Sequence, residues 1–78
     1  MYYVYLLKLS NGQTYVGYTK DLKRRLNEHQ TGQDDTTKRF LPCELVTYLG
    51  FKDKHKAATF ELYLKSGSGF SFRNRHFV

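Results

Sequence analysis

The 78-residue sequence has little that could cross-link it or anchor it in a membrane. It contains one cysteine, Cys43, so it can form neither an intramolecular disulfide nor a cysteine-based metal site. No run of about 20 apolar residues and no amphipathic helix with a long apolar face is present, so membrane binding is not expected. The apolar start, residues 1–9, lacks a basic leading stretch and a small-residue cleavage site. We therefore expect a soluble cytoplasmic protein without a signal peptide.

Acidic residues are also scarce. Seven Asp and Glu stand against 13 Lys and Arg, which gives a formal net charge of +6 and a pI near 9.6. A basic surface of this strength on a small body attracts polyanions, nucleic acid before acidic membrane. Seven Tyr and six Phe supply large buried areas from few residues. A chain of this length has room for one domain, so residues 1–78 are expected to form a single globular domain.

Two strands joined by a turn are predicted at the start of the chain. Residues 2–9 are rich in Tyr, Val and Leu and too short for a buried helix, and residues 13–18 form the returning strand. Ser10-Asn11-Gly12 between them is a turn signal. Because both faces of the first strand are largely apolar, we expect it to lie in the middle of a sheet.

The remaining elements alternate between helix and strand. They are a helix over 21–31 capped by Thr19 or Asp21 and ended by Gly32, a loop over 33–43, a strand over 44–51, a helix over 54–65 capped by Asp53, a break over 66–69, and a tail or short helix to 78. The predicted fold class is therefore α/β, a small three-stranded antiparallel sheet flanked by helices, in the order ββαβα plus a short C-terminal tail or helix.

A helical wheel of residues 21–31 separates the basic side chains of that helix. Leu22 and Leu26 mark its buried face, and Arg25 and His29, four residues apart, flank that face on the same side. The other polar residues, Arg24, Asn27 and Glu28, are predicted to point away. Arg25 either covers the sheet edge with its aliphatic stem or takes part in a site.

The second helix carries a carboxylate close to its buried face. Ala57, Phe60 and Leu64 define that face, and Glu61 falls in the same arc. A carboxylate there is unfavourable unless it is paired, hydrogen-bonded or bound to a metal. A salt bridge with a neighbouring arginine and a metal site both remain open. An unusual Glu on one helix together with an unusual Arg on another favours a functional site.

The aromatic triplets of the hairpin resemble those of a known nuclease family. Tyr3-Val4-Tyr5 and Tyr15-Val16-Gly17 stand where GIY-YIG nucleases carry their two signature triplets. The segment YTKDLKRRLNEH is similar to their first helix. FELYLKSGSG resembles the metal-binding helix of the small bacterial members, which are similar to the nuclease domain of the excinuclease C subunit. The likeness covers nearly the whole chain in the same order, with Tyr3 in place of the first Gly as one departure.

The resemblance implies roles for four residues of the hairpin and first helix. Tyr15 matches the tyrosine thought to activate or position the attacking water, and Tyr5 matches one that lines the site. Arg25 matches the arginine that contacts the scissile phosphate, and His29 matches a histidine of several branches. An ordinary tyrosine, with a pKa near 10, is only about 0.1% ionised at neutral pH. Tyr15 therefore either is activated by nearby positive charge or metal-bound water, or orients the water without deprotonating it.

The resemblance also implies a metal site. Glu61 matches the single protein ligand of a divalent metal, Mg²⁺ or Mn²⁺, and Asn74 is a looser match to an asparagine about a dozen residues further on. Mg²⁺ commonly keeps several waters and needs only one or two carboxylates, so a lone Glu is adequate. The other histidines, His55 and His76, are expected to be exposed. The other tyrosines, such as Tyr48 and Tyr63, are interpreted as core residues.

The expected function is that of a metal-dependent endonuclease hydrolysing phosphodiester bonds in DNA, in the setting of DNA repair. The alternative is a nucleic-acid-binding module of the same fold that does not cut. A bare catalytic domain would take its specificity from substrate shape, such as branched, nicked or single-stranded DNA, from dimerisation, or from a partner protein.

The position of the two tyrosines gives a structural expectation for the turn. Tyr5 and Tyr15 can line one site only if they emerge from the same face of the sheet. A two-residue Asn11-Gly12 turn puts them on opposite faces, whereas a three-residue loop pairs Tyr5 with Gly17 and puts them on one face. Such a loop needs Gly12 in a left-handed conformation. We therefore predict the three-residue loop with positive φ at Gly12.

Overall fold

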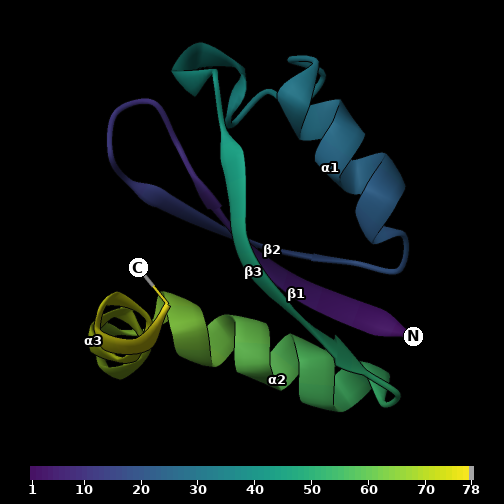
Figure 1. The fold of residues 1–78 in the computed structure, drawn as a ribbon. Coiled ribbons are helices and arrows are strands. Elements are labelled where there is room, and N and C mark those ends of the chain that lie inside the picture. Colours follow the sequence, from purple (N-terminus) through teal and green to yellow (C-terminus); the bar gives the residue numbers. More distant parts are fainter. Residues whose placement is uncertain (78) are drawn as a thin grey trace.

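The computed structural model describes residues 1–77 as a three-stranded sheet between two helical layers. Its elements are β1 (Tyr2–Lys8), β2 (Thr14–Thr19), α1 (Leu22–Gln30), the 3₁₀ turn η1 (Lys38–Phe40), β3 (Glu44–Phe51), α2 (Lys54–Lys65) and α3 (Gly67–His76). Helix α1 covers one face of the sheet, and α2 with α3 covers the other (Figure 1). Among the described residues, no helix is long and apolar enough to span a bilayer.

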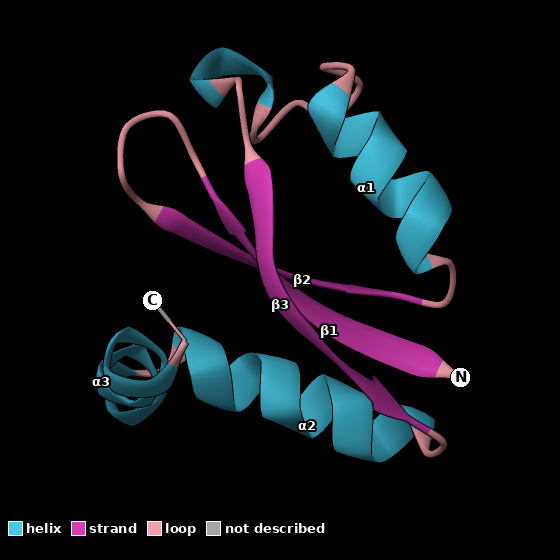
Figure 2. Cartoon of the chain, viewed as in Figure 1, coloured by secondary structure: helices cyan, strands magenta, loops and turns pink. Residues whose placement is uncertain are grey.

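The first strand lies in the middle of the sheet, as its two apolar faces predict. The strand order is β2-β1-β3, and both neighbours pair with β1 antiparallel. Figure 2 shows β1 between the other two strands. The α/β fold class, with a three-stranded antiparallel sheet flanked by helices, is confirmed.

The hairpin between β1 and β2 has the predicted three-residue loop. The backbone N–H of Leu9 donates to the carbonyl of Gln13 over 2.8 Å, and that of Gly12 donates to Leu9 over 3.0 Å. Gly12 has a φ of +86°, where a residue with a Cβ is strained. Tyr5 is consequently opposite Gly17, and Tyr15 is opposite Leu7. Tyr5 and Tyr15 therefore emerge from the same face.

Alternation along β1 divides the core into two clusters. Val4 and Leu6 point to the face covered by α2, where they pack with Val16, Ala57 and Leu64. The opposite face carries a second cluster of buried residues beneath α1 and η1: Tyr5, Leu7, Leu9 and Cys43. The hairpin and the loop after α1 are joined there, since the N–H of Ser10 donates to the carbonyl of Phe40 over 2.9 Å. Cys43 is a buried free thiol.

The C-terminal break is shorter than the sequence suggests. The glycine- and serine-rich segment 66–69 was expected to separate α2 from a tail, but Ser66 alone lies between α2 and α3. The Ser66 side chain accepts a hydrogen bond from the N–H of Gly69, so this serine caps the new helix where the old one ends. The segment 33–43, predicted as a loop, contains the short 3₁₀ turn η1.

Three side-chain placements differ from the prediction. Tyr48 and Tyr63 are not core residues, because 52% and 41% of their surfaces are exposed. Tyr48 lies on the edge strand β3, and Tyr63 on α2. Glu28 does not point away from the site, since Arg24 and Arg25 on the neighbouring turn of α1 both pair with its carboxylate. The remaining histidines, His55 and His76, are exposed as expected.

Candidate active site

Three rings from three elements, β1, β2 and α1, meet on the face that α1 covers. The hydroxyl of Tyr5 lies 2.7 Å from Nε2 of His29, and both residues are fully buried. The ring of Tyr15 lies 5.1 Å from that of His29 and 6.4 Å from that of Tyr5, measured between centroids. Tyr15 is partly exposed, so its ring reaches from this buried group to the surface. The hairpin register and the i, i+4 spacing of α1 together produce this grouping.

The glycine of the second triplet makes room for Tyr5. A Cβ at Gly17 would lie 2.2 Å from Cζ of Tyr5 and 2.3 Å from its hydroxyl oxygen. Two atoms that are not bonded cannot lie so close together, so the Tyr5 ring can pass over β2 toward His29 only because residue 17 is a glycine.

Helix α1 directs the side chains of two adjacent arginines into different surroundings. Asp21 caps the helix, its side chain accepting from the N–H of Arg24 over 3.1 Å. The side chain of Arg24 is 65% exposed, whereas that of Arg25 is 27% exposed and lies on the side of His29. The wheel thus places Arg25, and not Arg24, beside the ring cluster, as predicted.

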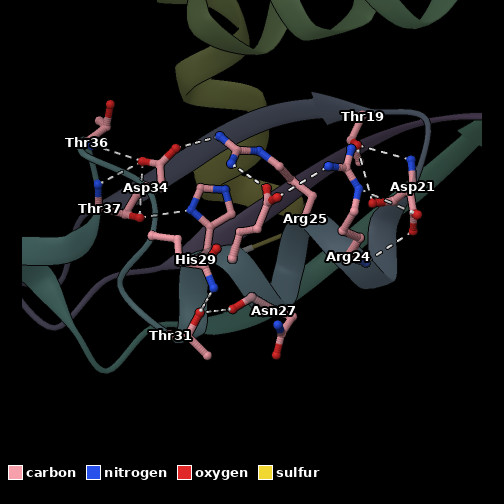
Figure 3. A network of polar contacts seen from close by, with 12 residues as sticks. Thr19, Asp21, Arg24, Arg25, Asn27, His29, Thr31, Asp34, Thr36 and Thr37 are labelled. Carbon is pink, nitrogen blue, oxygen red and sulfur yellow. Dashed lines mark hydrogen bonds and ion pairs between the residues drawn. The ribbon is translucent and has the colours of Figure 1, made fainter.

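Arg25 is held between two carboxylates. Its Nη1 donates to Oε1 of Glu28 over 3.0 Å. Its Nη2 donates to Oδ2 of Asp34 over 2.5 Å, and Figure 3 shows the two side chains facing each other. Burial alone would lower the pKa of Arg25, but the hydrogen bonds that it donates to Asp34 and Glu28 outweigh this effect and raise that pKa. Burial alone would raise the pKa of Asp34, but the hydrogen bond that Arg25 donates holds the pKa of that carboxyl below its usual range. Both groups are therefore charged at neutral pH.

Asp34 also connects Arg25 to the histidine. Its second oxygen, Oδ1, accepts hydrogen bonds from the backbone N–H groups of Thr36 and Thr37 and, over 3.3 Å, from the hydroxyl of Thr37. The Thr37 oxygen in turn lies 2.8 Å from Nδ1 of His29. Figure 3 shows Asp34 between Arg25 on one side and Thr37 with His29 on the other.

This chain of contacts fixes the tautomer of His29. Burial first, and then the positive charge of Arg25, lower the pKa of His29, so the ring is neutral at pH 7. The ionised Asp34 can only accept, so Thr37 gives it its single hydroxyl proton and must accept from His29. Nδ1 of His29 then carries the ring proton, and Nε2 accepts from the Tyr5 hydroxyl.

Tyr5 is consequently a fixed donor. Burial, followed by the nearby Tyr15, raises the pKa of Tyr5, so its hydroxyl stays protonated at neutral pH. It positions its neighbours and cannot serve as a general base. The hydroxyl of Tyr15 makes no hydrogen bond with any residue of the described chain and is not buried, so it can meet a substrate or a water.

The two remaining predicted site residues come from the helical layer across the sheet. Glu61 lies on α2, which packs on β1 and β2, and its 20% exposed side chain accepts from Nζ of Lys65 over 3.0 Å. The salt bridge considered from sequence is thus with a lysine of the next turn, not with an arginine. Asn74 is exposed on α3 and lines a pocket beside the hairpin turn. Direct contacts within residues 1–77 join Tyr5, Tyr15, Arg25 and His29 into one network, and leave Glu61 and Asn74 outside it.

Comparison with known proteins decides the family. The family model described as the GIY-YIG catalytic domain matches residues 1–74. The chain belongs to the GIY-YIG family. It is 42% identical to the UPF0213 protein SAG0778 of Streptococcus agalactiae over 81% of this chain and 73% of that one. It is 35% identical to the UPF0213 protein SSP2268 of Staphylococcus saprophyticus over 86% and 83%.

A solved structure agrees with this assignment. The solution structure of the UPF0213 protein BH0048 from Bacillus halodurans superposes with a TM-score of 0.59, at 33% identity, over 92% of this chain and 81% of that one. GIY-YIG is a nuclease-type family, and membership of this family implies nucleic acid as the class of substrate.

The GIY-YIG chain offers few protein ligands for a metal. Within residues 1–77, no three His, Cys, Asp or Glu side chains gather where they could hold an ion together. A hard cation such as Mg²⁺ that keeps its waters fits a single, partly exposed carboxylate, and Glu61 has one oxygen that is not engaged by Lys65.

Asp34 and Thr37 are the network residues of this GIY-YIG protein that sequence reasoning missed. They lie in a loop without periodicity, and the sequence alone does not show which of the adjacent residues Asp34 and Asp35 is buried. The structure separates them, since the side chain of Asp34 is 11% exposed and that of Asp35 is 94% exposed. One signal was present: an Asp three residues before a Thr, a spacing at which a side chain caps a turn.

Proposed function

We propose that the protein is a metal-dependent endonuclease that hydrolyses phosphodiester bonds in DNA, with branched or nicked DNA as the preferred substrate. The observation that carries the proposal is the grouping of Tyr15 and Arg25. The ring of Tyr15 packs on His29, and Arg25 is joined to the same histidine through Asp34 and Thr37, so one network positions a partly exposed hydroxyl and a charged guanidinium. The net charge of +6 is that of a protein that binds a polyanion.

Arg25 is suited to stabilise charge on the phosphate. A guanidinium has five N–H donors, and the contacts with Glu28 and Asp34 use one hydrogen each of Nη1 and Nη2. The donors that remain can bind phosphate oxygens as negative charge grows on them. The two carboxylates fix the orientation of the side chain before substrate binds, which lowers the cost of reorganisation.

Tyr15 is assigned to the attacking water. Its hydroxyl lies on the same face as Arg25 and can orient a water toward the phosphorus atom. The rings of the neutral His29 and the protonated Tyr5 are buried and pack against the Tyr15 ring, which holds that ring in place. A bound Mg²⁺ or Mn²⁺ would supply Lewis-acid stabilisation of the phosphate oxygens and of the leaving oxygen. Glu61 would hold it, and the remaining ligands would be waters and phosphate oxygens.

Glu61 would act across the edge of the sheet. β2 is an edge strand, with Tyr15 on one of its faces and α2 packed on the other. A phosphate group that lies over that edge can be approached from both faces. Asn74, on α3 beyond the same strand, is assigned to substrate positioning.

The test is a cleavage assay on flap, fork, nicked and linear DNA and on matched RNA, each with Mg²⁺, Mn²⁺ or EDTA. We expect metal-dependent cleavage of DNA that is suppressed by EDTA and falls about 10²-fold or more in Tyr15→Phe, which keeps the ring and loses the hydroxyl. Tyr48→Phe, at an exposed tyrosine of β3, is the matched control and should retain activity. Tight DNA binding without cleavage under all conditions would overturn the proposal in favour of a binding module.

A further inference from the structure

Arg73 is a buried cation that pairs with no carboxylate of residues 1–77. It lies on α3 with 9% of its surface exposed, and its Nη1 donates a hydrogen bond to Oγ1 of Thr14 on β2. Its Nε is buried without a partner among residues 1–77, and none of the ion pairs seen there involves it. A buried, unpaired charge is costly, so its presence calls for an explanation.

The guanidinium lines a pocket between the hairpin turn and α3. The pocket has a volume of about 410 Å³ and is lined by Gly12, Gln13, Thr14, Phe70, Arg73 and Asn74. The ring of Phe70 lies 4.9 Å from the guanidinium carbon and, with Thr14, holds the side chain in place. Neither of the two chain segments that build this region, residues 1–20 and 62–77, contains an Asp or Glu. The ligand that fits this chemistry is an anion.

We propose that this pocket binds a backbone phosphate of the nucleic acid at a subsite outside the reaction centre, with Arg73 as its main donor. The inference rests on the proposed function, because it takes the ligand to be the same DNA strand. Thr14 precedes Tyr15 on β2, so the two side chains emerge from opposite faces of one edge strand. A DNA strand carries one phosphate per about 3.4 Å of helix axis, so a strand engaged at Tyr15 presents a neighbouring phosphate to the pocket.

The unfavourable burial then has a functional reason. Burial lowers the pKa of Arg73, which shows that the folded protein disfavours the charge where it lies. A phosphate accepting from the unused donors of the guanidinium removes that penalty on binding. An arginine with a purely structural role would instead stabilise the fold, and the two roles therefore predict opposite effects of its removal.

The test compares Arg73→Gln with Arg75→Gln, a loss of the same charge at an exposed position of the same helix. Binding of a short fluorescein-labelled DNA duplex is measured by anisotropy in EDTA over a range of salt. Because no turnover is needed, failure of the cleavage assay and failure of this inference are separate results. Arg73→Gln should weaken binding and lower the slope of log K against log salt by about 0.9, the value for one phosphate contact. Arg75→Gln should change that slope less.

Two further measurements distinguish a phosphate-binding role of Arg73 from a structural one. The urea midpoint of Arg73→Gln should equal or exceed that of the wild type, and Arg73→Lys should keep most of the salt slope. Titration with inorganic phosphate should shift the amide NMR signals of Gly12 and Asn74 in the wild type but not in Arg73→Gln. Equal losses of DNA binding in Arg73→Gln and Arg75→Gln, or a destabilised Arg73→Gln that binds DNA as the wild type does, would overturn the phosphate subsite.

Discussion

Arg24 and Arg25 are adjacent in sequence, yet their surroundings differ. Arg24 is largely solvated, and its pairs with Asp21 and Glu28 lie at the surface, where they contribute little. Arg25 is enclosed by Glu28 and Asp34 beside the ring cluster. We expect Arg25→Ala to lower the cleavage rate by about 10²-fold or more, the loss typical of one charge-stabilising donor. Arg24→Ala should mainly weaken DNA binding and reduce its salt dependence. Single-turnover kinetics measure the first effect; similar behaviour of the two variants would contradict the placement.

Asp34 and Asp35 provide a second matched pair. Asp34→Asn removes the charge that holds Arg25 and weakens the acceptor of Thr37. The side chain of Asp35 is 94% exposed, and within residues 1–77 it pairs with Lys38 alone. We expect Asp34→Asn to cost about 1–3 kcal/mol in the free energy of unfolding, as for a buried hydrogen bond to a charge. We also expect it to lower the cleavage rate about 10-fold, an effect smaller than that of removing a charge-stabilising donor itself. Asp35→Asn should change the free energy of unfolding by no more than about 0.5 kcal/mol and should leave the cleavage rate as in the wild type.

A double mutant separates positioning from packing. If Asp34 acts on the reaction by orienting Arg25, its substitution should have little further effect on the rate once Arg25 is Ala. Independent, multiplying effects on the rate would show instead that Asp34 acts by another route.

At the scale of elements, the contact between β1 and β2 depends on Gly17. A Cβ there would overlap the buried ring of Tyr5, and moving that ring breaks its hydrogen bond with His29. We expect Gly17→Ala to destabilise the protein by about 1–3 kcal/mol, the cost of overpacking a core. Gly67→Ala, where a Cβ meets nothing within 4 Å, should be neutral or slightly stabilising. Urea denaturation gives both values. A penalty for Gly17→Ala that persists undiminished in a Tyr5→Leu background would contradict the assigned clash.

Much of the element-level structure could be predicted because local chemistry determines it. Strand β3 and helix α2 have the predicted bounds, since Asp53 caps α2 and a turn precedes it. The hairpin register followed from requiring two tyrosines on one face. The start of α3 could not be predicted, because Gly67 and Gly69 are poor helix formers and become helical only where Ser66 caps them and α2 supports them.

At the scale of the whole molecule, the burial of His29 makes stability depend on pH. The pKa of His29 is lowered in the folded protein, so as pH falls the unfolded chain takes up this proton first. Stability should therefore fall as pH drops below about 6.5, the ordinary value, and continue to fall until the folded pKa is reached. One proton contributes at most about 1.4 kcal/mol per pH unit. The lowered pKa of Asp34 acts in a separate window, below its ordinary value of about 3.9.

Urea denaturation at a series of pH values from about 7.5 to 5 measures this slope, over the range in which an ordinary histidine titrates. His29→Gln should flatten it, because the buried titrating group is gone, while His55→Gln, at an exposed position, should leave it unchanged. An equal slope in the wild type and in His29→Gln would show that another group is responsible.

The site itself could be predicted only in part. The resemblance to GIY-YIG nucleases singles out Tyr5 and Tyr15, and strand parity and helix spacing, which are local rules, then place them on one face with Arg25 and His29. The link through Asp34 and Thr37 depends on how the loop after α1 folds back over the sheet, which no periodicity encodes. The pairing of Glu28 with both arginines likewise depends on the rotamers of three long side chains.

Metal dependence through Glu61 is the most direct test of the proposed nuclease, because Glu61 is the proposed protein ligand and lies on α2, in the helical layer opposite Arg25. Calorimetric titration with Mg²⁺ and Mn²⁺ is to be made on wild type, Glu61→Ala and Glu44→Ala, an exposed glutamate of β3, beside DNA binding and cleavage of the same proteins. We expect Glu61→Ala to lose metal affinity and cleavage while it binds DNA as tightly as the wild type or more tightly, since a ligand and a negative charge are removed together. Glu44→Ala should behave as the wild type. Unchanged metal affinity and turnover in Glu61→Ala would contradict the assignment.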